Sequence, residues 1–170
     1  AGSVLVQATQ FKQTESGRMD VSGTQQGGQL TLQAKGKVEI QGQIDASSTG
    51  ANSQGGQVTV ATQGDVELNN ATVDVSGGRG GQMNISAAAP AQPTNPQPLP
   101  DVPGQGRLAI MGNSALSARG RSGQAGNVTL LGDHLELLDA SRIQATGETG
   151  GGTVLVGGDW QGKGDLYQAT

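Results

Sequence analysis

The sequence predicts an all-β fold: a right-handed parallel β-helix of about six coils, with roughly 26 residues and three short strands in each coil. Three observations predict it. A small-residue pair recurs before an alternating apolar triplet, two further alternating segments follow within each period, and Gly, Ser, Thr and Val occupy the positions where a helix needs helix formers.

The strongest repeat is a pair of small residues, usually Gly-Gly, followed by a polar residue and an apolar-x-apolar triplet. Between successive pairs the second residue advances by 26, 28, 25, 45 and 26 positions, so one step is an outlier. The six segments are AGSVLV from Ala1, GGQLTL from Gly27, GGQVTV from Gly55, GGQMNI from Gly80, AGNVTL from Ala125 and GGTVLV from Gly151.

Two more strands are predicted in each period, from segments such as KVEIQ and DVELN and then IDASS and VDVSG. Residues one period apart match in type, which favours parallel stacking over an antiparallel sandwich, and the crossover rule favours right-handed winding. The residues predicted to face inward are Leu30, Leu32, Val38, Ile40, Ile44 and Ala46 in one coil and Val58, Val60, Val66, Leu68, Val73 and Val75 in the next.

The outlier step coincides with a proline-rich insertion. All six prolines lie between Ala87 and Pro103, and proline lacks the N–H that a strand ladder needs. We therefore expect residues 1–170 to form one β-helix segment, with residues 88–103 leaving the fourth coil as an extruded loop. Such a loop is a candidate contact site, with Pro93, Asn95, Pro96 and Leu99 as its contact residues.

Composition excludes several classes of function. The net charge of −4 and the lack of a basic stripe argue against nucleic acid as a partner, and no apolar run of 18 residues predicts membrane insertion. Zero cysteines exclude a disulfide scaffold and a thiolate metal site. The chain opens inside a strand-like segment without an initiator Met, so we expect an excised piece of a longer exoprotein.

The periods GGQLTLQAKGKVEIQGQIDASS and LGDHLELLDASRIQATGETGGGTVLVGGDWQGKGDLYQAT resemble the filamentous haemagglutinin-type exoproteins of two-partner secretion, a family of β-helix repeat adhesins that begin with a haemagglutination-activity domain. The resemblance covers nearly all of the chain outside the proline-rich loop. It implies export through an outer-membrane β-barrel transporter, localisation on the surface of a Gram-negative bacterium, and binding to a host-cell receptor or a polysaccharide. The Asn-Pro-Asn-Leu type motifs of the secretion domain's start are absent, which places the segment beyond that start.

Two acidic columns are candidates for chemistry. Asp20, Asp45 and Asp74 recur at one outward position, where they could hold a cation, serve as acid–base carboxylates, or act as solvated corner residues, the reading we favour. Glu39, Glu67 and Glu136 form a second column, interrupted by Ala109, next to a mixed-charge column that contains His134. Neither column predicts a catalytic residue, a metal or a cofactor, and we expect no enzyme activity.

Other recurring polar residues suggest binding or modification. Arg79, Arg119 and Arg121 near one corner form a candidate patch for an anionic glycan, and the sequons at Asn70, Asn84 and Asn127 are candidate glycosylation sites. A threonine array resembling that of ice-binding solenoids is broken at Asn84 and Leu155. Stacked amides are predicted to form a ladder, and we expect Trp160 to cap the segment beyond the last repeat. The amide column is Gln29, Gln57, Gln82 and Asn127.

The function predicted from these patterns is a rigid fibre segment of a secreted adhesin that attaches to host cells or biofilm matrix. The alternatives are a β-helix domain that binds or degrades a polysaccharide, and a module that binds ice or glycans directly on a flat face. A cleft lined by acidic and basic side chains on one face would favour the degrading enzyme.

Overall fold

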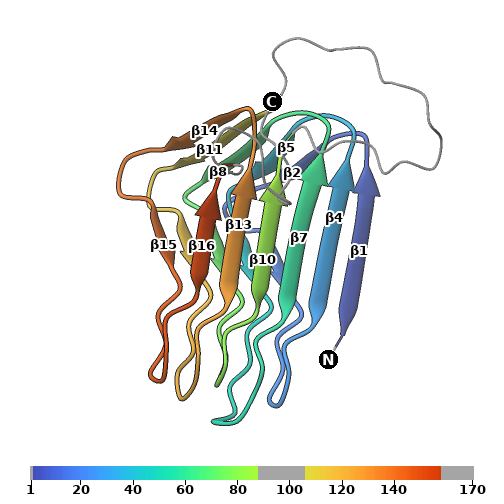
Figure 1. The fold of residues 1–170 in the computed structure, drawn as a ribbon. Coiled ribbons are helices and arrows are strands. Elements are labelled where there is room, and N and C mark those ends of the chain that lie inside the picture. Colours follow the sequence, from blue (N-terminus) through green and yellow to red (C-terminus); the bar gives the residue numbers. More distant parts are fainter. Residues whose placement is uncertain (1, 88–105, 158–170) are drawn as a thin grey trace, which may run out of the picture.

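The computed structural model describes residues 2–87 and 106–157, which contain sixteen β-strands and no helix. The strands form three parallel sheets that wrap around one axis, confirming the predicted parallel β-helix. In Figure 1 the strands of the first sheet run upward side by side, and each coil passes behind them before it returns one strand further along. This winding is right-handed.

Each coil contributes one strand to each sheet. The first sheet contains β1 (Ser3–Ala8), β4 (Gln29–Ala34), β7 (Gln57–Thr62), β10 (Gln82–Ser86), β13 (Asn127–Leu131) and β16 (Thr153–Val156). The second sheet contains β2 (Phe11–Gln13), β5 (Val38–Ile40), β8 (Val66–Asn69), β11 (Arg107–Met111) and β14 (His134–Leu137). The third sheet contains β3 (Arg18–Asp20), β6 (Gln43–Asp45), β9 (Thr72–Asp74), β12 (Ala115–Ser117) and β15 (Arg142–Gln144).

The register of the sheets equals the period of the sequence. Leu30 pairs with Val58, which pairs with Met83, and Met83 pairs with Val128 across the outlier step. The described residues form five complete coils, and β16 is the first strand of a sixth. The sequence predicted about six coils; within the described part of the chain, the sixth is represented by this one strand.

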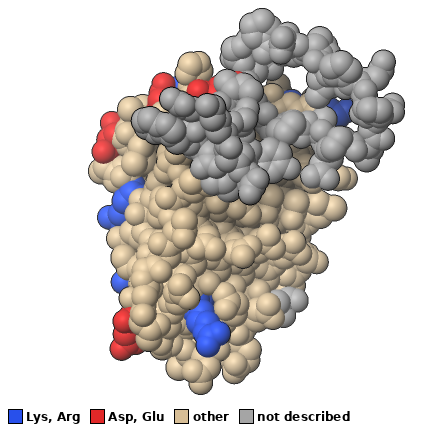
Figure 2. All heavy atoms as spheres, viewed as in Figure 1, with Lys and Arg blue, Asp and Glu red and all other residues tan. Residues whose placement is uncertain are grey.

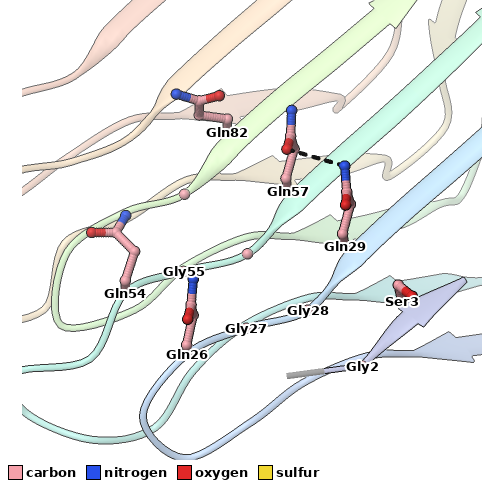
Figure 3. Close-up of a pocket in the computed structure, with 12 residues that line it drawn as sticks. Gly2, Ser3, Gln26, Gly27, Gly28, Gln29, Gln54, Gly55, Gln57 and Gln82 are labelled. Atoms are coloured by element: carbon pink, nitrogen blue, oxygen red, sulfur yellow. Dashed lines mark hydrogen bonds between the residues drawn. The ribbon is translucent and has the colours of Figure 1, made fainter.

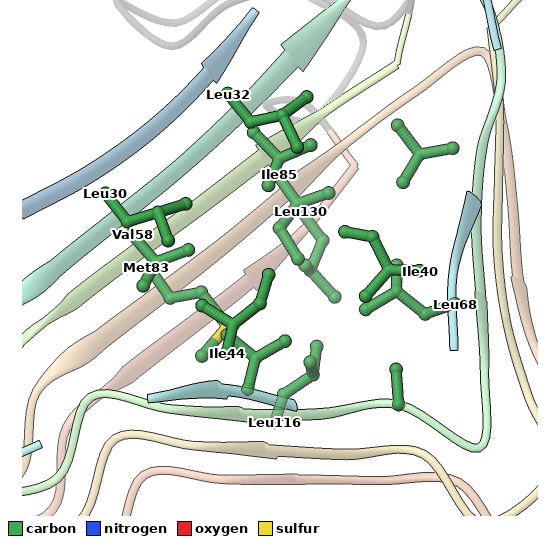
Figure 4. Packing of buried hydrophobic residues seen from close by; sticks show 14 of the residues in the cluster. Leu30, Leu32, Ile40, Ile44, Val58, Leu68, Met83, Ile85, Leu116 and Leu130 are labelled. Atoms are coloured by element: carbon green, nitrogen blue, oxygen red, sulfur yellow. The ribbon is translucent and has the colours of Figure 1, made fainter. Parts of the chain in front are cut away.

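The core is a stack of aliphatic side chains along the axis (Figure 4). All twelve side chains predicted to face inward in the second and third coils are buried, most of them completely. Leu30 and Val58 of the first sheet face Ile44 of the third, while Ile40 and Leu68 close the second side. Because the layers are thin, each coil fills its interior with a few aliphatic residues and needs no aromatic cluster.

Gly-Gly corners join the third sheet to the first, and there the backbone of adjacent coils comes close. A Cβ placed on Gly55 would lie 1.9 Å from the carbonyl oxygen of Val75, and one on Gly27 would lie 2.0 Å from that of Ala46. The glycines are therefore required by packing between coils. The predicted proline-rich loop, residues 88–103, lies outside the described residues, between β10 and β11.

Candidate functional site

The outward face of the first sheet carries no charged side chain. Its residues are uncharged polar groups with a few small or aliphatic ones, and Figure 2 shows few charged atoms over this face. The charges lie mainly on the other two sheets and at the corners. The outward residues are Ser3, Leu5 and Gln7; Gln29, Thr31 and Gln33; Gln57, Thr59 and Ala61; Gln82, Asn84 and Ser86; Asn127, Thr129 and Leu131; and Thr153 and Leu155.

The threonine array on this face is interrupted, as the sequence indicated. Thr31 and Thr59 are adjacent, but Asn84 separates them from Thr129. Leu5 and Leu155 occupy the two ends of the same column. A regular threonine surface therefore extends over only two neighbouring coils, which does not favour ice binding.

A groove runs along the corner where the loops enter the first sheet. We call it the corner groove; it is a hollow of about 520 Å³ that spans four coils. It is lined by Gly2, Ser3, Gln26, Gly27, Gly28, Gln29, Gln54, Gly55, Gly56, Gln57, Gly81 and Gln82, none of which is charged.

The corner groove is built from a repeated Gln-Gly-Gly-Gln segment, residues 26–29 and 54–57. Two amide columns flank the glycines (Figure 3). The sheet column consists of Gln29, Gln57 and Gln82, which are in register on the first sheet, and the loop column consists of Gln26 and Gln54, joined by a β-bridge.

The predicted amide ladder is formed in register, but its hydrogen bonding is sparse. The side-chain Nε2 of Gln29 lies 3.5 Å from Oε1 of Gln57, at the limit of a hydrogen bond. Gln54 of the loop column donates to the carbonyl oxygen of Gly80 at 2.6 Å. The side chains of Gln26 and Gln82 make no hydrogen bond to any residue that the structure describes, so most of their donors and acceptors face solvent.

The second sheet carries a chain of ion pairs across its first three strands. Glu39 lies 3.0 Å from Lys12 and 2.6 Å from Lys37, and Lys37 also lies 2.9 Å from Glu67. The hydrogen bonds from Lys37 and Lys12 hold the pKa of the Glu39 carboxyl below its usual value. The sequence indicated the alternating charges but missed Lys12, which extends the column to the first coil.

Further along the same sheet, Arg107 binds Glu136 through two nitrogens, with Nε 3.1 Å from Oε2. The guanidinium hydrogen bonds lower the pKa of Glu136. His134 is exposed on β14, as predicted, and Ala109 occupies the interruption in the glutamate column. These carboxylates are paired with cations, which stabilises the charged form.

The aspartate column has a structural role at the corner. Asp20, Asp45 and Asp74 are stacked in register, and each accepts a hydrogen bond from the backbone N–H two residues later, at 2.9, 3.0 and 2.8 Å. This local turn directs the chain out of the third sheet. The hydroxyl and N–H of Ser22 hold the pKa of Asp20 below its usual value.

The three arginines of the predicted patch line two different hollows. Arg119 and Arg121 line one hollow, together with Glu148, whereas Arg79 lines a different one between Asn52 and Gln124. Arg121 reaches across the third coil and donates to the carbonyl oxygen of Ser48 at 2.7 Å, which ties down one of its nitrogens. Arg79 makes no ion pair or side-chain hydrogen bond within the described residues.

The three sequons occupy different settings. Asn70 is exposed at a turn with a φ of 54°, and its Oδ1 accepts from the N–H of Asn113. Asn84 and Asn127 lie on the outward face of the first sheet, where Asn84 is half-buried and Asn127 is exposed. The predicted contact residues Pro93, Asn95, Pro96 and Leu99, and also Trp160, lie outside the described residues.

Within residues 2–87 and 106–157, no three His, Asp or Glu side chains come together in a way that could hold a metal ion. The same residues contain no helix that could cross a membrane. Comparison of the chain with family models, with curated proteins and with solved structures finds no match. What the fold and surfaces define is thus a class: a repeat-built parallel β-helix with one uncharged face.

Proposed function

We propose that this chain is a rigid segment of a secreted bacterial surface adhesin, exported by two-partner secretion and displayed on a Gram-negative cell. The observation that carries the proposal is the uninterrupted aliphatic core within three parallel ladders. Such a stack makes a stiff rod, because each coil is held to the next by hydrogen bonds on all three sides. Its partners are the outer-membrane transporter during export and a host-cell receptor or polysaccharide afterwards.

The ends of the solenoid support a role within a longer fibre. On β16, the inward-facing positions Val154 and Val156 are 43% and 53% exposed, and Leu137 on β14 is 55% exposed. Val4 and Phe11, in the first coil, are only partly buried. Further coils of the same kind would cover these side chains, as neighbouring repeats do in solenoids.

The state of the carboxylates supports a non-catalytic role. A general acid needs a raised pKa, whereas the pKa values of Asp20, Glu39 and Glu136 are lowered by their partners. These features favour attachment over depolymerisation.

The test compares the 170-residue chain with a variant that lacks residues 88–103, in a screen for attachment to host cells and to biofilm polysaccharide. We expect the chain to attach and the deletion to weaken attachment, because the insertion is the contact site predicted from the sequence. A reducing-sugar assay runs in parallel on the same polysaccharides. Sugar release would replace the adhesin by the enzyme, and lack of attachment by the intact chain would refute the adhesive role.

A second candidate function is direct polysaccharide binding by the rod itself. The observation that favours it is the uncharged outward face of the first sheet together with the corner groove. Amides and hydroxyls on a rigid sheet are the groups that hydrogen-bond sugar hydroxyls. Binding that survives deletion of residues 88–103 would support this function.

A further inference from the structure

We propose that the corner groove binds a neutral, extended polysaccharide that lies parallel to the solenoid axis, with about one sugar residue on each coil. The inference rests on the polysaccharide-binding role proposed above and assigns to it a site, a ligand class and a direction.

The carboxamides that flank the groove suit the hydroxyl groups of a sugar. Each carboxamide of the sheet column and the loop column offers two N–H donors and an oxygen with two lone pairs. A sugar hydroxyl likewise donates and accepts, so an amide can satisfy it in either sense. All twelve lining residues are uncharged, and Arg79, which follows Gln54 in the loop column, lines a different hollow, so the groove itself offers an anionic glycan no cation. The groove therefore selects a neutral polymer.

The side-chain amides of the sheet column are available to a ligand. The amide ladder is nearly open, since the Gln29–Gln57 contact is 3.5 Å long and Gln82 has no side-chain partner among the described residues. Gln54 is different: its 2.6 Å hydrogen bond to Gly80 fixes the side chain on the loop side of the groove (Figure 3). Gln54 is thus anchored, while the sheet column keeps most of its hydrogen-bonding groups free for a ligand.

The distance between successive coils matches the length of one sugar residue. Successive coils are separated by about 4.8 Å, which is close to the length of one pyranose in an extended β-linked glycan. Sugar hydroxyls then recur in step with the amides of Gln29, Gln57 and Gln82. An extended peptide advances by about 3.4 Å per residue and falls out of step. The match favours a glycan over a peptide.

The floor of the groove carries no side chains. A Cβ on Gly56 or Gly81 would lie within about 2.2 Å of a backbone oxygen of the preceding coil, so packing excludes side chains there. The floor between the two amide columns is therefore bare backbone over successive coils. A polymer chain can lie along it without steric interruption.

The binding test uses nuclear magnetic resonance titration of the isotope-labelled 170-residue chain. The probes are cellohexaose, which is neutral and extended, maltohexaose, which has the same sugar in a curved α-linked chain, and oligogalacturonate, which is anionic. We expect cellohexaose to shift the side-chain amide signals of Gln29, Gln57 and Gln82. Because no aromatic side chain lines the groove, the dissociation constant should be on the order of 1 mM. The other two probes should bind more weakly.

Paired variants locate the site. Gln29→Ala/Gln57→Ala removes two neighbouring amides from the sheet column. The matched control is Gln7→Ala/Gln33→Ala. It also removes two amides from neighbouring coils, hydrogen-bonded at 3.1 Å, but they lie near the C-terminal ends of β1 and β4, at the opposite end of the strands from the corner groove. We expect the first variant to weaken cellohexaose binding about tenfold and the control to change it by less than about twofold. Circular dichroism checks that both variants fold.

The wild-type titration keeps the inference testable even if a variant misfolds. Groove amides that do not shift with cellohexaose, shifts confined to another face, or equal losses in the two variants would each overturn it. Attachment to host cells without glycan binding in the groove would remove this inference and leave the adhesive role. Glycan binding in the groove without attachment to cells or matrix would do the reverse.

Discussion

A close backbone contact between coils gives a sharp test of the fold, through the substitution Gly56→Ala. An added Cβ would lie 2.2 Å from the carbonyl oxygen of Gly28 and 2.7 Å from that of Ala46. Both are backbone atoms, so no side chain can rotate out of the way. Gly28 accepts a ladder hydrogen bond from Gln57, and Ala46 accepts one from Gly56 itself. Relieving the clash must therefore weaken two hydrogen bonds.

The expected cost follows from these contacts. Overpacking a filled interior costs about 1–3 kcal/mol. Each of the two weakened hydrogen bonds adds about 1 kcal/mol, for a total of about 3–5 kcal/mol. In a urea titration followed by circular dichroism, with an m-value of about 2 kcal/mol/M, the midpoint should fall by about 2 M.

The matched control is Gly2→Ala. Gly2 occupies the same place in the first coil, where its carbonyl accepts from Gln29, yet a Cβ there has no atom within 4 Å. The substitution should leave the midpoint unchanged or raise it slightly, because alanine reduces the conformational entropy of the unfolded chain relative to glycine. Equal midpoints for the two variants would refute the predicted stacking of the corners.

Three further predictions follow from the structure. Ser114→Ala should lower the free energy of unfolding by about 1–3 kcal/mol in a urea titration, because the buried Ser114 hydroxyl accepts a hydrogen bond from the N–H of Ala71. The control is Ser141→Ala, at the half-buried equivalent position one coil later, which should lower it by less than about 0.5 kcal/mol. Because folding lowers the pKa of Glu39, the charged Glu39 carboxylate stabilises the fold above about pH 4.3, and this stabilisation is lost as the pH falls through the folded pKa. Glu39→Gln should therefore reduce the drop in urea midpoint between neutral and acidic pH. An unchanged drop would contradict this. The sequons at Asn70, Asn84 and Asn127 predict added hexose in the intact mass of the protein isolated from its native source, and the unmodified mass would remove that prediction.

The fold could be predicted because its period is written into the sequence. When residues 26 or 28 positions apart match in type, as Val4, Leu30 and Val58 do, the pairing register follows from counting. The outward columns follow by the same counting, and the stacking of the Asp and Gln columns is confirmed. The length of the outlier step did not prevent this, since β10 and β13 pair as predicted.

The loops and corners could not be predicted in the same way. Arg79 lies in a shorter corner segment than Arg119 and Arg121, so the sequence period does not fix their relative positions, and they line separate hollows. The corner groove depends on the path of the chain between the Gln columns, which repeat counting does not give. Inside the first coil, Gln13 faces the core and donates to the carbonyl oxygen of Gln43, a buried polar contact that no sequence pattern signals.

The direction of the ladders has a mechanical consequence. Strands run across the axis, so their hydrogen bonds point along it, and a force that pulls the two ends apart loads one coil boundary at a time (Figure 1). The rod is then expected to lengthen in a sawtooth of nearly equal steps, each releasing about 26 residues, or roughly 85–95 Å of extended chain. The boundary between Met83 and Val128 encloses 45 residues and should give one longer step, roughly 150 Å.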